Sequence, residues 1–138
     1  MQRLYLVIAD AILVLHALIV LFNVGAVPLI WVGHLRRWKF VRDFSFRAAH
    51  LLLIAFVVAE TVLGAMCPLT AWEDALRAKA GADPRYQGGY VAWWLHRLIF
   101  YDLNESVFVA AYGLFFALVL LTWVWVRPRP PVWWGRKT

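Results

Sequence analysis

Residues 4–31 read LYLVIADAILVLHALIVLFNVGAVPLIW, a run in which Asp10 is the only acid, His16 is the only histidine, and lysine and arginine are absent. About 20 apolar residues in helical form cross the hydrocarbon core of a bilayer. Two further stretches, 46–66 and 106–126, meet the same requirement. Inside hydrocarbon each segment has to satisfy its own backbone polar groups, so helix is the expected form. The sequence therefore predicts an all-α membrane protein with three transmembrane helices.

The composition supports a single membrane domain over residues 1–138. Hydrophobic residues make up 64% of the chain and charged residues 16%, whereas soluble domains are about 45–50% apolar. The mean hydropathy is +0.68. Nine tryptophans and five tyrosines are an excess of the residues that favour the membrane–water boundary. A water-soluble globule is excluded.

The distribution of basic residues predicts the orientation. The first connection holds one acid, Asp43, and five basic residues: Arg36, Arg37, Lys39, Arg42 and Arg47. The tail at 127–138 holds no acid and four basic residues: Arg127, Arg129, Arg136 and Lys137. Basic and acidic residues balance in the loop at 68–104. The positive-inside rule then places the first connection and the C-terminus in the cytoplasm, and the N-terminus and the long loop outside.

The net charge of +6 is carried by residues that flank the hydrophobic segments. Anionic lipids are therefore the expected partners, together with other membrane subunits, and nucleic acid is not expected. The first helix is longer than a bilayer requires, at about 42 Å over residues 4–31. Tilt, protrusion or a bend is expected, and the stretch from Asn23 to Pro28 is where a bend would be easiest.

The long loop carries signals for one or two short helices at the outer face. Thr70-Ala-Trp-Glu73 has the spacing of a capping box, which predicts a helix at about 71–80 that ends before Pro84. After Gly88 and Gly89, apolar residues recur at helical spacing over 91–99. This second segment is too short to span, so it is expected to lie in the outer interface or against another protein.

The same loop carries a family resemblance. Cys67-Pro-Leu-Thr70-Ala-Trp-Glu73-Asp-Ala-Leu-Arg77, followed by Tyr86-Gln-Gly88-Gly89-Tyr-Val, resembles the DUF2784 family of small bacterial membrane proteins. Ala9-Asp10 and His16 fit the first helix of that family, and His50 and Glu60-Thr-Val-Leu-Gly64 fit the second, so the resemblance covers about residues 5 to 101. It implies a protein of the bacterial inner membrane and supplies no activity.

Three ionisable side chains are expected inside the membrane: Asp10, His16 and Glu60. Each costs several kcal/mol there unless it is paired or hydrated. Counted from the outer ends of the helices, Glu60 lies level with Asp10; counted from the inner ends, it lies level with His16. The pair that Glu60 forms could be a proton relay, a polar ligand pocket or a structural hydrogen bond that fixes the helix packing.

Several other side chains have both a structural and a functional interpretation. His16 and His50 could be axial ligands of a haem b if the first helix bends, because a straight helix separates them in depth. Cys67, the only cysteine, is expected to be a small buried hydrophobe, and no metal site is predicted. Arg77 could bind a lipid phosphate or pair with Glu73 one turn away.

No sequence motif for catalysis is present, so enzyme activity has no positive support. The expected function is that of a non-catalytic accessory or scaffolding subunit of an inner-membrane complex, because three helices enclose little volume for a substrate path. The alternative is a haem b-binding, proton-handling or lipid-binding membrane protein.

Overall fold

The computed structural model describes residues 1–82, 104–131 and 133, and all regular secondary structure in these ranges is helical. Helix α1 covers Gln2–Leu35, the 3-10 turn η1 Phe40–Arg42, α2 Phe44–Leu63, α3 Pro68–Lys79 and α5 Glu105–Trp125. Helices α1, α2 and α5 are long and apolar enough to cross a membrane. The predicted all-α membrane protein with three spanning helices is confirmed. The predicted segment at 91–99, with Gly88 and Gly89 before it, lies outside the described residues.

The turn that joins α1 to α2 is defined by a few backbone features. Arg37 has φ +58°, and the Trp38 N–H donates to the Gly33 carbonyl at 2.8 Å, which together terminate α1. A Cβ at Gly33 would collide with the side chain of Val41, so the close approach of η1 to α1 requires glycine there. Asp43 then caps α2 by accepting the Phe46 N–H at 3.3 Å.

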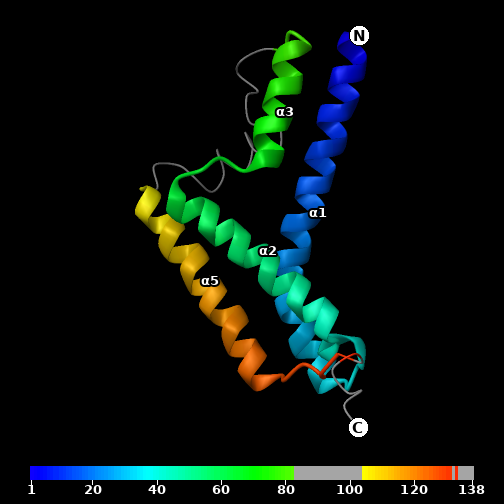
Figure 1. Cartoon of the computed structure of the whole chain (residues 1–138), viewed down its shortest axis with the longest axis vertical. Helices are drawn as coiled ribbons and strands as arrows, with labels where there is room; N and C mark the ends of the chain where they lie inside the picture. The colour runs from blue at the N-terminus through cyan, green and yellow to red at the C-terminus, as the bar shows by residue number, and fades with distance from the viewer. Residues whose placement is uncertain (83–103, 132, 134–138) are drawn as a thin grey trace.

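The helices pack as two pairs (Figure 1): α3 lies beside the first half of α1, and α5 lies beside α2. Two small apolar clusters hold the membrane-spanning parts together. In one cluster Val27, Ile54 and Val119 meet from α1, α2 and α5, and in the other Ala26 and Ile30 of α1 meet Val126 just beyond α5. The clusters therefore fix the depth at which the three helices face one another.

Helix α1 is continuous through Pro28, so the expected bend between Asn23 and Pro28 does not interrupt it. It is 14 residues longer than α2, which corresponds to an excess length of about 21 Å. The turn through η1 holds the C-terminal end of α1 next to the start of α2, so the excess protrudes at the N-terminal end, where α3 packs against it (Figure 1).

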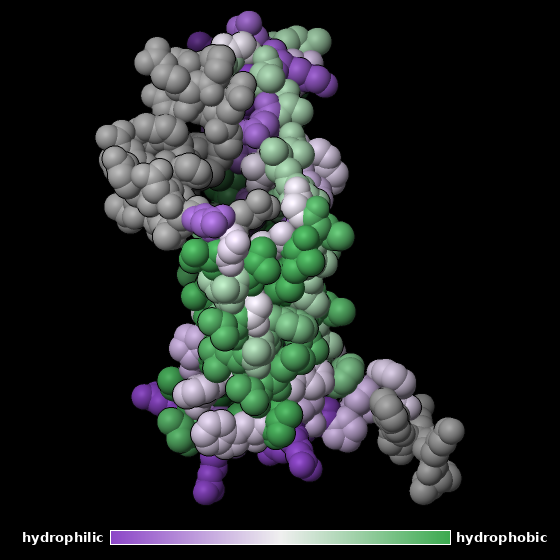
Figure 2. All heavy atoms as spheres, turned by 90° about the vertical axis from the view of Figure 1, so that its left-hand side faces the viewer, coloured by the Kyte–Doolittle hydropathy of each residue, from purple (hydrophilic) through white to green (hydrophobic). Residues whose placement is uncertain are grey.

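The two ends of the molecule differ in charge. Hydrophobic side chains form a band that is flanked by hydrophilic ones at both ends (Figure 2). We call the end that holds residues 36–42 and 127–129 the basic end, and the opposite end the α3 end. At the basic end the tail returns to the first connection, where the Arg129 N–H donates to the Arg42 carbonyl at 2.7 Å and the Arg42 Nε–H donates to the Arg127 carbonyl at 3.2 Å.

Candidate functional site

A cavity of about 590 Å³ lies between α1, α2 and α5, and its wall includes the first residues of α3. Most of its lining is aliphatic or aromatic. The side chains in the lining that carry a polar or ionisable group are His16, Asn23, Glu60, Thr61, Cys67 and Tyr112. Among the described residues, this cavity is therefore the place where an intramembrane carboxyl group, a histidine and hydrocarbon surface meet.

Two buried oxygens in this lining have no hydrogen-bond partner among the described residues: Oε1 of Glu60 and Oδ1 of Asn23. Two other polar groups of the lining are engaged by their own helices, since the Asn23 side-chain amide donates to the Ile19 carbonyl at 3.2 Å and the Thr61 hydroxyl donates to the Val57 carbonyl at 2.8 Å. The Cys67 thiol lies within hydrogen-bonding reach of the Glu60 carboxyl group. A buried acceptor without a donor costs roughly 1–3 kcal/mol. The two oxygens are thus unsatisfied acceptors, and because both have almost no accessible surface, a donor reaches them only when neighbouring side chains move.

Glu60 and His16 line the same cavity. The basic ends of α1 and α2 are joined through η1 while the other end of α1 protrudes. No direct hydrogen bond between the two side chains is formed within the described ranges, so their pairing stays a prediction. Asp10 does not line the cavity, because it lies more than one turn beyond His16 on the protruding part of α1.

The predicted capping box at the start of α3 is wrong. The helix begins at Pro68, with Cys67 at the N-cap position and no side-chain cap bond. Proline fits the first helical position because its missing N–H would have no partner there. Thr70 is therefore inside the helix instead of preceding it. Cys67 is a half-buried free thiol that lines the cavity.

Arg77 binds two carboxylates and connects α3 to α1. Its Nε–H donates to Oε1 of Glu73 at 2.8 Å and its Nη2–H donates to Oδ1 of Asp10 at 2.8 Å. Glu73 is buried and Asp10 is largely exposed. Partial burial lowers the pKa of Arg77, but the bonds and charges of Glu73 and Asp10 outweigh it, so the pKa lies above its ordinary value. Of the two predicted roles for Arg77, the structure shows the pairing with Glu73.

Sequence reasoning missed a polar cluster nearer the basic end. Arg47, which was counted with the first connection, is fully buried in α2, where its Nη2–H donates to the Thr122 hydroxyl at 3.1 Å and its guanidinium lies 5.7 Å from the ring centre of Trp123. One turn further, Nε2 of His50 is 2.9 Å from the Asn23 carbonyl. The signal was available, because Arg47, His50 and Ile54 fall on one helical face.

The structure does not bring His16 and His50 together. Nε2 of His50 is engaged by Asn23, which lies seven residues, or about 10 Å, further along α1 than His16. A haem held by both histidines stays a prediction, and we derive no haem chemistry. Across residues 1–82, 104–131 and 133, no group of three or more His, Cys, Asp or Glu side chains is arranged to hold a metal ion.

Comparison with known proteins gives one match. A family model described as "Protein of Unknown function (DUF2784)" matches residues 6–128, which is most of the chain and includes most of α1, all of α2, α3 and α5, and the cavity between them. No curated protein and no solved structure matches. The chemistry of the site therefore has to be inferred from its own residues.

Proposed function

Because the chain belongs to the DUF2784 family, whose description names no activity, we propose its function from the geometry: it binds an amphipathic molecule in the cavity beside Glu60. The observation that carries the proposal is the buried, unpaired Oε1 of Glu60 in a cavity with a mainly apolar lining. An apolar cavity with a few polar groups is the usual form of a small-molecule site.

The lining selects the class of ligand. The aliphatic and aromatic wall suits a hydrocarbon chain, while the carboxyl group of Glu60 accepts hydrogen bonds from a head group. Asn23 is level with His50, ten residues or about 15 Å along α2 from Glu60, so its amide oxygen lies beside the chain and not beside that head group. The matching head group carries donors, such as a primary amine or hydroxyls. An amine has the additional advantage of a positive charge opposite an ionised Glu60, and this charge-assisted bond is stronger than a neutral one. A lipid with an ethanolamine head has both parts.

The proposed setting is the inner membrane of a bacterium. The basic residues at 36–42 and 127–129 support an orientation in which the basic end faces the cytoplasm and the N-terminus lies outside. In that orientation the cavity opens in the outer half of the bilayer, because Glu60 lies near the end of α2 that leads to α3. A ligand would then enter from the outer leaflet.

Lipid titration of the delipidated protein, followed by native mass spectrometry, tests the proposal. Phosphatidylethanolamine and phosphatidylcholine share a phosphate and chains, but choline has no N–H donor, so we expect the wild type to bind the ethanolamine lipid about tenfold more tightly. Glu60→Ala removes both the charge and the acceptor and should abolish this preference, whereas Ser45→Ala, an exposed position near the basic end, should keep it. Equal affinities for the two lipids in the wild type would refute the proposal.

An accessory subunit of a membrane complex is the second candidate function. The protruding half of α1 carries large apolar side chains that are 39–64% exposed, namely Leu4, Val7, Ile8, Val14 and Leu15. Part of this surface lies above the level of α2 and α5 (Figure 1), where another subunit would cover it. The native mass of protein purified gently from its own membrane distinguishes the candidates, because an accessory subunit is recovered with its partners.

A further inference from the structure

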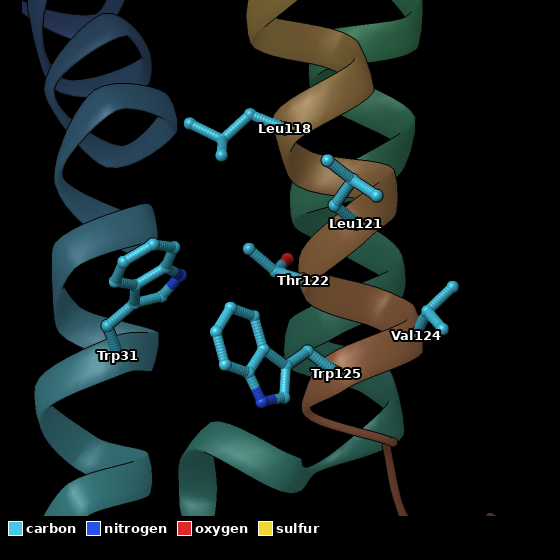
Figure 3. A pocket seen from close by; sticks show the side chains of 6 residues that line it. All are labelled: Trp31, Leu118, Leu121, Thr122, Val124 and Trp125. Atoms are coloured by element: carbon cyan, nitrogen blue, oxygen red, sulfur yellow. The ribbon is translucent and has the colours of Figure 1, made fainter.

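A groove runs between α1 and α5 at the basic end. The cavity of Glu60 lies toward the α3 end of the membrane-spanning region. The groove is a hollow of about 500 Å³ lined by Trp31, Leu118, Leu121, Thr122, Val124 and Trp125. A second hollow of about 310 Å³ shares Trp31 and Trp125 with the first and extends to His34, Leu35 and Val126. Leu118, Thr122 and Trp125 point from α5 toward α1, where Trp31 faces them (Figure 3).

The groove is bounded by two tryptophans of the kind found at membrane interfaces. The ring centres of Trp31 and Trp125 are 6.0 Å apart and the side chains are 46% and 76% exposed. Tryptophan favours the depth at which hydrocarbon meets head groups. The groove therefore extends from the apolar core, at Leu118, to the head-group level, at Leu35. An acyl chain of a phospholipid follows the same course from the bilayer core to the head group.

Positive charge surrounds the head-group end of the groove. The exposed basic side chains at this end are Arg36, Arg37, Lys39, Arg42, Arg127 and Arg129. Asp43 is the only acidic residue in 36–47 and 127–131, and its carboxylate caps α2. An anion is thus the complementary ligand for this end.

A further positive charge lies behind the floor of the groove. Arg47 is fully buried, and its Nη2–H donates to the hydroxyl of Thr122, which lines the groove. Nε and Nη1 of Arg47 have no hydrogen-bond partner, and in the described part of the chain no carboxylate pairs with it. A buried charge without a counter-ion is costly, and a nearby anion lowers that cost.

We propose that the groove between α1 and α5 is a binding site for one anionic phospholipid. One acyl chain lies between Trp31 and Leu118, and the phosphate lies at the basic end, where it is bound by the surrounding arginines and compensates the charge of Arg47. This site is independent of the cavity at Glu60 and of the ligand proposed there, because the two share no lining residue.

Native mass spectrometry of the full chain in a neutral detergent, titrated with phosphatidylglycerol or phosphatidylcholine of identical chains, tests the site. The wild type should bind one phosphatidylglycerol at least about fivefold more tightly, and each arginine removed by Arg36→Gln or Arg127→Gln should reduce that preference by up to about fivefold. Leu121→Trp fills the groove and should abolish it. Trp72→Ala removes an exposed tryptophan of α3 and should leave it unchanged.

Three results would overturn the proposal: equal affinity of the wild type for the two lipids, a phosphatidylglycerol preference that survives Leu121→Trp, or a dimer that forms through the groove and excludes lipid. Circular dichroism of each variant confirms that the helices are intact. Because Leu121 is 63% exposed, a larger side chain is accommodated there without disturbing the packing of α5. The loss of lipid binding would then report on the groove.

Discussion

Glu73 is a buried carboxylate whose partner, Arg77, lies one turn further along α3. A carboxylate in such a position is stable only when it is paired, because burial removes the water that would otherwise solvate it. Thr70, in contrast, lies three residues before Glu73 and makes no cap bond. The two residues, which the sequence pattern joins in one motif, therefore contribute very differently to stability.

Thr70→Ala should change the free energy of unfolding by less than about 0.5 kcal/mol, because it removes no cap and alanine is the better helix former. Glu73→Ala should destabilise by roughly 1.5–3 kcal/mol, because it removes a charged hydrogen bond from Arg77. Thermal unfolding in detergent micelles, followed by circular dichroism, measures both. Similar losses of unfolding free energy for the two variants would support the capping box and contradict the structure.

The sequence predicted some of these residue contacts because they are local. The Glu73–Arg77 pair follows from i,i+4 spacing alone. The Asp10–Arg77 pair joins positions 67 residues apart, and it depends on how far α1 protrudes, which a hydropathy pattern does not define. The capping box failed because Pro68 fits the first helical position as well as it fits a loop. Helical spacing therefore has to be judged together with the residue that begins the helix.

At the scale of the elements, α3 is docked on α1 through one ion pair that is open to water on the Asp10 side. Asp10 is 64% exposed and Arg77 is 16% exposed in their side chains. Exposed pairs of this kind contribute about 0.2–1 kcal/mol. Next to the pair, Ala9 of α1 is fully buried, and α1 and α3 are in extensive contact.

Asp10→Asn should loosen this docking without unfolding α3, because Arg77 keeps its bond to Glu73. In a Cys67→Ser background, a thiol placed by Ala9→Cys should then react about 1.4- to 5-fold faster with a soluble maleimide, which is the range that the exposed pair implies. Ala26→Cys, which is buried between the membrane-spanning helices, is the matched control and should not change. An unchanged rate at Ala9 would show that the ion pair does not hold α3.

The pH dependence of that docking follows from the raised pKa of Arg77. When the pKa of a basic group is higher in the folded state, its stabilisation of the fold is fully present at any pH below the ordinary arginine pKa. That stabilisation is lost only as the pH rises through the higher, folded-state pKa. The rate at which maleimide reacts with the Ala9→Cys thiol, corrected for the fraction of thiolate, should therefore stay constant from about pH 8 to about pH 11. Protection lost within that range would mean that a group other than Arg77 controls the docking.

The elements themselves were largely predictable, and their positions in depth were not. Hydropathy located the three spans to within a few residues, because hydrocarbon imposes the same length on each. Arg47 was counted with the first connection although the predicted span already began at residue 46. Helix α2 begins at Phe44, which places Arg47 in its first turn, with the side chain directed inward to Thr122. Which polar groups share a level thus depended on helix ends, which are the least defined feature of a hydrophobic pattern.

At the scale of the whole molecule, the exposed charge is asymmetric: basic residues gather at one end, and acidic and basic residues mix around α3. In intact cells, a thiol introduced by Lys79→Cys in a Cys67→Ser background should react with a membrane-impermeant maleimide. Lys39→Cys and Arg129→Cys should react only after the membrane is opened. All three positions are described and lie outside the helical spans, so accessibility reports on sidedness. The reverse pattern would invert the proposed orientation and the leaflet assigned to each site.

The hydrogen bonds between Arg42 and the tail have a mechanical consequence. They tie the end of α5 to the turn between α1 and α2, so all three spans are fastened at the same end of the molecule. At the opposite end α2 is joined to α1 through α3, whose docking includes the exposed Asp10–Arg77 ion pair. Because such a pair is weak, separation of α1 from α2 is expected to begin at the α3 end. The basic end would then act as the hinge for opening the cavity of Glu60, which lies nearly a helix length away.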